Sequence, residues 1–318
     1  MSAISELSKI KVDKARTPEE KAARRKEAGR DNKAGYLFLL PWLIGLVVIT
    51  IGPMIASLYL SFTDYSLIQA PQWVGLENYI RMIDDPRLHN SLRVTFTYVF
   101  VSVPLQLIMA LGVALLLDKG MRGLALYRSI FYLPSMLGGS VAIALLWRQM
   151  FGTDGMVNQV LRLFGIDATT GWIADPKYAL GTLILLHIWT FGSPMVIFLA
   201  GLRQIPGMYY EAASIDGATR MQKFFKITMP LLSPIIFFNL VLQIIGAFQS
   251  FTQAFVVSNG TGGPSDSTMQ YTLYLYQRGF GQFQMGYAAA MAWLLVVIVG
   301  VLTAINFFAS KYWVFYDD

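Results

Sequence analysis

The sequence contains no cysteine and only two histidines among its 318 residues. The absence of cysteine excludes disulfide bonds, thiolate metal ligands and a cysteine nucleophile. His89 and His187 are far apart in the sequence and have no ligands at metal-binding spacing around them, so we expect no metal site. The phosphate-binding pattern Gly-x-x-x-x-Gly-Lys-[Ser/Thr] is also absent, and no grouping of residues suggests catalysis. We therefore predict that the chain is not an enzyme and carries no nucleotide site of this type.

Charged residues are also scarce. They make up 14% of the chain, against 55% hydrophobic residues, and the mean hydropathy is +0.51. A soluble domain usually has about a quarter of its residues charged, whereas the long uncharged stretches here each supply the roughly 20 apolar residues that cross a bilayer as a helix. We predict an all-α integral membrane protein with six transmembrane helices, near residues 36–62, 92–117, 128–149, 179–202, 231–257 and 286–309.

Basic residues are distributed unevenly between the segments that join these helices. With the N-terminus inside, 18 of the 25 lysines and arginines fall in inner segments and 7 in outer ones. The positive-inside rule therefore predicts that both termini are cytoplasmic. The same asymmetry explains the basic pI of about 9.4 without nucleic acid as a partner. Residues 1–34 form a charged cytoplasmic tail, where Thr17-Pro18-Glu19-Glu20 predicts a capped short helix, and residues 35–318 form the transmembrane domain.

One polar, helix-favouring segment, residues 203–230, lies between long apolar blocks on the basic side of the chain. Pro206 suits a first helical turn and Gly217 offers a turn, so a short helix, a bend and a second short helix are predicted. Small side chains would let this segment approach another surface closely, and its carboxylates would accept hydrogen bonds from a partner's Arg or Lys. The alternative is an ordinary amphipathic loop helix. The residues that fit a docking role are Glu211, Ala212, Ala213, Asp216, Gly217 and Ala218.

The fifth predicted helix carries polar residues at spacings of four, three, four and three, which places them on one stripe. Because polar side chains are costly in hydrocarbon, the stripe must face protein or water. It serves either interhelical hydrogen bonding or the lining of a path for a hydroxyl-rich solute. His187 in the fourth helix is open to the same two interpretations, packing and pathway. The stripe consists of Asn239, Gln243, Gly246, Ser250 and Gln253.

Two outer segments have recognisable features. The segment between the third and fourth helices is long enough for a short interfacial helix around residues 155–164. A glycine-rich loop that contains Thr261-Gly262-Gly263-Pro264 follows the fifth helix. Without the phosphate-binding pattern, this loop gives no reason to predict a phosphate site.

The segment 203–230 closely resembles the cytoplasmic loop of bacterial ABC-importer permeases. The resemblance rests on Glu211-Ala212-Ala213, on Gly217 four residues after the second alanine, and on Ile227 and Pro230. Thr261-Gly262-Gly263-Pro264 is typical of the carbohydrate branch, of the maltose or glycerol-phosphate permease type. The similarity extends from about Tyr36 to Phe308. Residues 90–95 read N-S-L-R-V-T where the family usually has an Asn-Thr pair, so the resemblance does not fix the start of the second helix.

The resemblance implies a type I ABC-importer permease fold and a multi-pass subunit of the bacterial inner membrane, surrounded by lipid. Such a subunit would provide half of the pathway for a sugar or oligosaccharide and would pair with a second, homologous permease as a heterodimer. The segment 203–230 would be the coupling helix that docks on two ATPase subunits, which would bind the ATP and Mg, since the permease itself binds no cofactor. Closure of the ATPases would drive alternating access. The Thr261–Pro264 loop would face the extracytoplasmic solute-binding protein.

A secondary transporter driven by an ion gradient is the competing hypothesis. Such transporters normally place ionisable residues near the bilayer midplane, and the predicted spans offer only His187 there. The neutral stripe favours an uncharged sugar over an acidic one, although Arg148 or Arg93 at the outer mouth could serve an anion. The sequence does not identify the carbohydrate.

Overall fold

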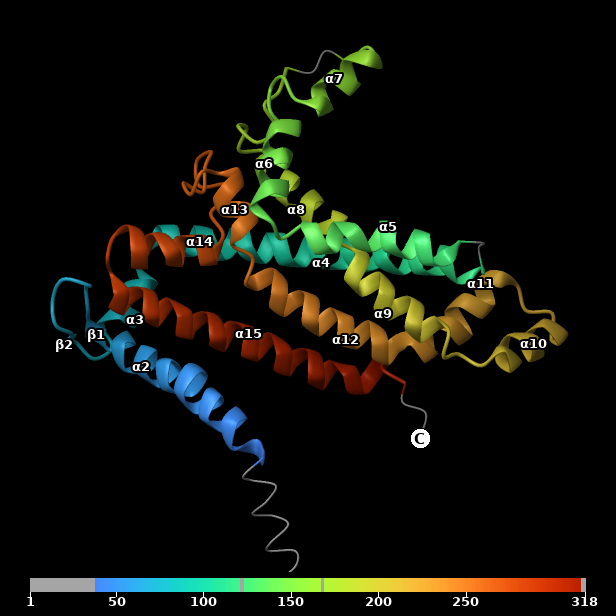
Figure 1. Cartoon of the computed structure of the whole chain (residues 1–318), viewed down its shortest axis with the longest axis horizontal. Helices are drawn as coiled ribbons and strands as arrows, with labels where there is room; N and C mark the ends of the chain where they lie inside the picture. The colour runs from blue at the N-terminus through green and yellow to red at the C-terminus, as the bar shows by residue number, and fades with distance from the viewer. Residues whose placement is uncertain (1–37, 121–122, 167–168, 316–318) are drawn as a thin grey trace, which may run out of the picture. The chain divides into compact units, whose positions relative to one another are not determined.

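The computed structural model describes residues 38–120, 123–166 and 169–315, and these are almost entirely helical (Figure 1). The chain divides into two compact units, Met1–Tyr59 and Leu60–Asp318, which are considered separately. The predicted N-terminal tail and its capped helix lie outside the described residues.

The described part of the first unit belongs to an apolar helix, Phe38–Ser61. This helix includes a π-helical stretch, η2 (Leu46–Ile51), and continues as α2 (Gly52–Ser61). None of the residues in its most apolar window is buried within the structure. A helix that is apolar all round and exposed along its length fits a lipid environment, in agreement with the first predicted span.

The second unit contains three further helical stretches that are long and apolar enough to cross a membrane: α4 (Pro86–Asp118), Arg220–Val257, and α15 (Met285–Trp313). With the two bent pairs described below, the described residues provide four to six candidate spans. The prediction for the second helix was wrong at its start, because α4 begins at Pro86 rather than near residue 92. Asp85 explains the difference, since its side chain accepts hydrogen bonds from the backbone N–H groups of Arg87 and Leu88 and caps the helix.

Three of the predicted helices are broken. The pair α5 (Leu124–Leu137) and α6 (Val141–Met150) is bent by 94°, and the pair α8 (Ala179–Trp189) and α9 (Gly192–Leu202) by 40°. The fifth helix divides into α12 (Met229–Phe248) and α13 (Thr252–Val257), with residues 249–251 non-helical. The spans predicted near 128–149, 179–202 and 231–257 are therefore each formed by two helical pieces, and the breaks between the pieces were not predicted. Composition does not distinguish a broken apolar span from a straight one.

Side chains of neighbouring helices donate hydrogen bonds to the backbone carbonyls at two of these breaks. Gly138, between α5 and α6, accepts a hydrogen bond at its carbonyl from Gln253 Nε2 of α13, at 3.1 Å. The carbonyl of Thr190, between α8 and α9, accepts from Ser135 Oγ of α5 at 2.8 Å and from Gln106 Nε2 of α4 at 3.1 Å. These bonds satisfy backbone carbonyls that a broken helix leaves unpaired, which is required at membrane depth.

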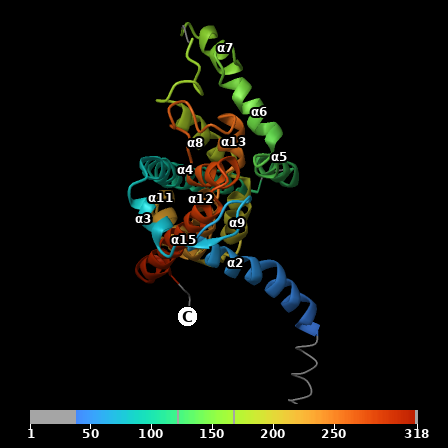
Figure 2. The ribbon, with the colours of Figure 1, turned by 90° about the vertical axis from the view of Figure 1, so that its left-hand side faces the viewer.

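Shorter elements complete the second unit. The strands β1 (Thr63–Asp64) and β2 (Gln72–Trp73) pair antiparallel. The helix α7 (Met156–Leu163) follows α6 and confirms the short helix predicted around 155–164; its place at a membrane interface stays a prediction. Figure 2 shows α6 and α7 from the side. The remaining elements are α3 (Glu77–Ile83), α10 (Gly207–Ile215), α11 (Arg220–Lys223), η3 (Phe224–Thr228), α14 (Tyr271–Tyr276) and η4 (Gln277–Gly281).

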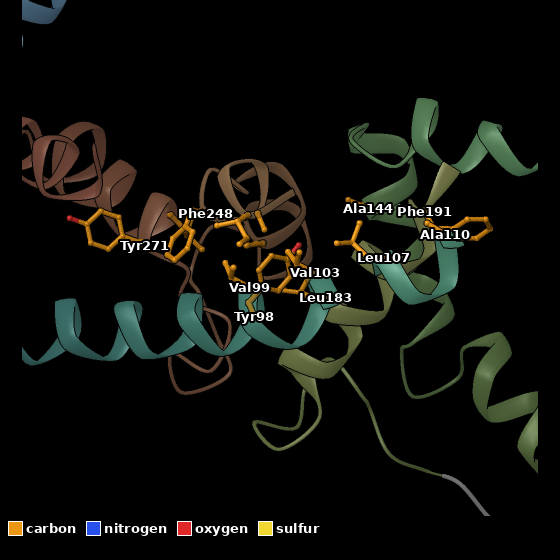
Figure 3. Close-up of a cluster of buried hydrophobic side chains, with 14 of the residues drawn as sticks. Tyr98, Val99, Val103, Leu107, Ala110, Ala144, Leu183, Phe191, Phe248 and Tyr271 are labelled. Carbon is orange, nitrogen blue, oxygen red and sulfur yellow. The ribbon is translucent and has the colours of Figure 1, made fainter. Parts of the chain in front are cut away.

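The core of the second unit forms around α4. Tyr98, Val99 and Val103 of α4 are almost completely buried, and Figure 3 shows them beside Leu183 of α8 and Phe248 of α12. Ala110 and Ala114, further along α4, are also fully buried. Because their side chains are small, neighbouring helices can approach α4 closely there. This packed centre holds α4, α8, α9 and α12 together and so fixes the positions of the segments that leave it at both ends.

The segment that contains α7 is held together by a buried asparagine. Asn158 Nδ2 donates to the carbonyls of Thr153 and Thr170, both at 2.8 Å, and Asn158 Oδ1 accepts from Trp172 Nε1 at 2.6 Å. The side chain is completely buried. It therefore joins the two ends of the segment.

Replacing Asn158 by leucine is expected to open this segment, because the carbonyls of Thr153 and Thr170 and the indole N–H of Trp172 lose their partner. Cleavage by trypsin after Lys177 in the folded protein should become roughly tenfold faster, as expected for a loss of 1–3 kcal/mol locally. The matched control is Gln159→Leu, which removes only an exposed hydrogen bond to the carbonyl of Asp154. Equal cleavage rates for the two variants would contradict this role of Asn158.

Candidate coupling and translocation sites

The segment 203–230 forms the predicted short helix, bend and second short helix. The bend occurs at Gly217, whose φ of +76° favours glycine. Ala218 N–H bonds back to the carbonyl of Ala213 at 2.9 Å, closing the end of α10. Thr219 and Gln222 then form a capping box that begins α11. Pro206 lies at the N-cap of α10, just before the first turn in which it was predicted.

The surface of α10 is available to a partner. No residue of α10 is buried, and Ile215 is 88% exposed. Among the described residues, neither Glu211 nor Asp216 has an ion-pair partner. Exposed apolar side chains next to unpaired carboxylates are typical of a protein contact surface. Further large apolar side chains exposed on this segment are Met208, Met221 and Phe225.

The segment 203–230 leads directly into α12. The helical path runs from α11 through η3 into α12 without interruption (Figure 1). The hydroxyls of Tyr210 and Thr228 lie 2.9 Å apart, and Lys223 Nζ contacts Ser214 Oγ. These contacts connect α10 to α11 and η3, which lead into α12.

The polar stripe is divided by the break between α12 and α13. Asn239 is completely buried, with Nδ2 donating to the carbonyl of Ile235 at 3.2 Å and Oδ1 without a partner among the described residues. Gln243 is half-buried and Gly246 is exposed. The break places Ser250 outside any helix and Gln253 on α13. The prediction of one stripe on a single helix was therefore wrong.

The two outer members of the stripe have packing roles. Gln253 Nε2 donates to the carbonyl of Gly138, which is the interhelical bond of the first interpretation. Ser250 Oγ lies 3.4 Å from Gln253 Oε1. These contacts favour the packing interpretation for Ser250 and Gln253, and the pathway interpretation stays a prediction for Asn239, Gln243 and Gly246.

A groove between α5 and α9 was not predicted from the sequence. Its volume is about 440 Å³. Arg128 Nε at this groove is buried and has no hydrogen-bond partner among the described residues. Ser129 and Tyr132 are three residues apart on α5 and therefore lie on one face of the helix. This spacing of polar side chains was the sequence signal that could have indicated the groove. The lining consists of Arg128, Ser129, Tyr132, Ser193, Val196 and Ile197.

The glycine-rich loop is held in a defined conformation. Thr268 Oγ1 donates to the carbonyl of Gly263 at 2.9 Å, and Gly262 N–H donates to Ser258 Oγ at 3.0 Å. Gly262 has a φ of +73°, and a Cβ there would collide with Met269. Residues Thr261 to Pro264 therefore form a preorganised surface feature.

A cavity of about 410 Å³ lies between this loop and the segment that follows α6. Arg148, near the end of α6, lines the cavity, and its guanidinium donates to Asn259 Oδ1 of the loop. Arg93, the other arginine considered for an anion, is exposed on α4 and does not line this cavity.

A buried carboxylate at the start of α4 was also missed. Asp85 Oδ2 accepts hydrogen bonds from Tyr274 at 2.6 Å, from Tyr287 at 2.8 Å and from Arg278 Nη2 at 3.0 Å. Burial on its own would raise the pKa of Asp85, but these donors and the capped Leu88 N–H outweigh it and hold the pKa at about 2. The carboxylate thereby connects α4, α14, η4 and α15.

His187 lies inside the packed unit. Its ring meets the edge of the Tyr98 ring, with centroids 5.4 Å apart, and its Nε2 is buried without a partner among the described residues. Its carbonyl accepts a hydrogen bond from Gln106. This placement favours the packing interpretation over a pathway role.

Comparison with known proteins gives consistent matches over most of the chain. Residues 86–312 match the model of the family described as binding-protein-dependent transport system inner membrane component. The probable ABC transporter permease protein YesP of Bacillus subtilis is 56% identical over 91% of this chain and 94% of its own length. The lactose transport system permease protein LacF of Rhizobium radiobacter is 33% identical over 87% and 94%, respectively.

A solved structure supports the fold. A chain from a bacterial alginate ABC transporter, in complex with a periplasmic protein bound to alginate pentasaccharide, has a TM-score of 0.78 at 23% identity. The match covers 90% of this chain and 96% of the other. Together with the helical spans and the exposed coupling segment, these matches favour the importer hypothesis over the ion-gradient transporter. The chain belongs to the family of binding-protein-dependent transport system inner membrane components.

Proposed function

We propose that this chain is a permease subunit of an ATP-driven ABC importer for a carbohydrate and provides half of the translocation pathway. The observation that carries the proposal is the exposed coupling helix α10, continuous through α11 and η3 with α12. Each bent pair counts as one span, which gives six spans with both termini in the cytoplasm of a bacterium. The excess of basic residues in the inner segments supports this orientation.

The coupling role is assigned to the surface of α10 and the bend after it. Glu211, Ala212 and Ala213 lie on α10, with Asp216, Gly217 and Ala218 at its end. Two partner ATPase subunits supply the energy by binding ATP and Mg, because this chain lacks the phosphate-binding pattern. Their closure moves α10 and, through η3, the base of α12. Movement of that helix against a second, homologous permease alternates access between the two sides of the membrane.

The carbohydrate assignment is supported by the relative named for lactose transport and by the chemistry of the candidate pathway. Gln243 on α12 and the hydroxyls of Ser129 and Ser193 in the α5–α9 groove are neutral partners for sugar hydroxyls. At the outer end, the preorganised Thr261–Pro264 loop faces the solute-binding protein.

Replacing Gln243 by leucine is expected to reduce carbohydrate uptake about tenfold while leaving assembly unchanged, because a hydrogen-bonding group of the path is lost at a half-buried site. Asn239→Leu should likewise impair uptake more than assembly. Gln253→Leu is the matched control: its side chain bonds the carbonyl of Gly138, so assembly and uptake should fall together. Uptake and recovery of the complex are measured for each variant in proteoliposomes. Parallel loss of both for Gln243→Leu would show a packing role instead.

The function as a whole is tested by co-expression with the candidate ATPase, second permease and binding protein, followed by purification and reconstitution. Saccharide uptake should require ATP and the binding protein. Uptake by the purified chain alone, without ATP but dependent on a proton or sodium gradient, would contradict the proposal.

A further inference from the structure

The cavity between α6 and the glycine-rich loop has the size of a small-ligand site. Its volume of about 410 Å³ lies within the range of roughly 300–1,000 Å³ that is usual for such sites. Four segments form its walls: the end of α6, and residues 152–153, 171–174 and 257–264. It lies at the end of the second unit where the solute-binding protein is proposed to contact the chain.

The walls of this cavity are fixed before any ligand arrives. On one side, Asn158 joins residues 153 and 170 through its two hydrogen bonds. On the other side, Thr268 and Ser258 hold the loop through Gly263 and Gly262. A preformed cavity avoids the cost of ordering loops when a ligand binds.

Arg148 is the charged side chain in the lining of this cavity, and no carboxylate among the described residues pairs with it. One of its five N–H donors is directed at Asn259 Oδ1, which orients the guanidinium and leaves other donors available. A planar guanidinium with free donors matches the geometry of a carboxylate. A half-buried cation without a counter-charge is also costly, so an anionic ligand gains affinity by supplying one.

The rest of the lining is neutral. Thr153, Thr261 and Asn259 provide hydroxyl and amide groups around the arginine, and such groups suit sugar hydroxyls. A second arginine without an ion-pair partner among the described residues, Arg128, lies in the hydroxyl-lined groove of α5, the helix that precedes α6. An arginine next to hydroxyl groups thus occurs both in the cavity at the end of α6 and in the groove beside α5.

We propose that the cavity is an entry subsite for an acidic saccharide, in which Arg148 pairs with the carboxylate of a uronic acid unit. Thr153, Thr261 and Asn259 hold the hydroxyls of the same unit. This inference rests on the proposed function and narrows its substrate class. It also revises the expectation of an uncharged sugar, which was based on the stripe of α12 alone.

The test uses the assembled transporter in proteoliposomes with its binding protein. The probes are a uronic acid trisaccharide and its carboxyl-reduced counterpart, which has the same linkages and hydroxyls but no charge. Wild type is expected to take up the acidic probe. Arg148→Gln should reduce that uptake about tenfold, as expected for the loss of a charged pair, whereas Arg148→Lys should lose less. Lys177→Gln, which removes an outer charge that does not line the cavity, is the matched control and should leave uptake unchanged.

Binding-protein-stimulated ATP hydrolysis is measured alongside uptake and should stay unchanged in Arg148→Gln. If hydrolysis falls with both probes, Arg148 pairs with the binding protein and the inference is wrong. The inference is also overturned if wild type takes up only the neutral probe, or if Arg148→Gln takes up the acidic probe at the wild-type rate. Either of these results would leave the proposed function, carbohydrate import, unaffected. Uptake of neither probe nor any other saccharide by wild type would instead refute the proposed function.

Discussion

Replacing Asp85 by asparagine is expected to lower the free energy of unfolding by about 3–5 kcal/mol, the usual cost of breaking a buried ion pair. The side chain of Asp85 is 5% exposed and that of Arg278 is 17% exposed, so neither charge is well solvated once the other is gone. An amide has only one acceptor oxygen, so either Tyr274 and Tyr287 or the capped N–H groups of Arg87 and Leu88 lose their acceptor. Thermal and denaturant unfolding of the purified protein in detergent would measure the loss.

The control for Asp85 is Asp266→Asn at the ion pair of Arg87 and Asp266, which is partly exposed, with 41% and 31% of the two side chains accessible. This variant should lose at most about 1 kcal/mol, because solvent screens exposed pairs. Combining Asp85→Asn with Arg278→Met should cost less than the sum of the single losses. Strict additivity would show that the two residues do not stabilise each other.

Acid should have a related effect. Asp85 has a folded-state pKa of about 2, below its ordinary value of 3.8. Its contribution to stability is therefore fully present above about pH 4 and is lost as the pH falls through about 2. The Asp85→Asn variant should lack this part of the acid sensitivity.

Replacing Glu211 by lysine is expected to reduce both carbohydrate uptake and binding-protein-stimulated ATP hydrolysis at least tenfold. Reversing an exposed, unpaired charge on α10 places like charges together where the carboxylate is proposed to meet basic groups of the ATPase, at a cost of several kcal/mol. The fold should not change, because the exposed side chain of Glu211 makes no hydrogen bond or ion pair with the described residues. The measurement is co-purification of the ATPase followed by assays of hydrolysis and uptake.

Asp64→Lys is the matched control for Glu211. It makes the same charge reversal at an exposed position of β1, in a segment predicted to lie outside. Its uptake and hydrolysis should match wild type. Retention of full coupling by Glu211→Lys would remove α10 from the proposed ATPase contact.

The sequence was sufficient for the features that depend on local pattern. Long uncharged runs located the apolar helices, and Gly217 with its neighbours located the bend after α10, because a positive φ at that point favours glycine. The helix α7 was also predicted, from the length of its segment.

Features that depend on contacts between distant residues were missed. Asp85 pairs with Arg278, and nothing in the residues around Asp85 indicates that partner. The carbonyl of Gly138, at the break between α5 and α6, is bonded by Gln253. The polar stripe is divided by the non-helical residues 249–251. Helical periodicity indicates neither feature. The groove at Arg128 likewise requires α5 and α9 to lie side by side.

The linked breaks have a mechanical consequence for transport. A displacement at the base of α12 travels along a rigid helix only as far as residues 249–251, where the helical hydrogen bonds stop. Beyond that point, the bond from Gln253 to the carbonyl of Gly138 passes the displacement sideways to the junction of α5 and α6. In the proposed alternating access, the movement therefore passes through this junction rather than along one rigid helix, so the displacements at the proposed cytoplasmic and outer ends need not be equal or parallel.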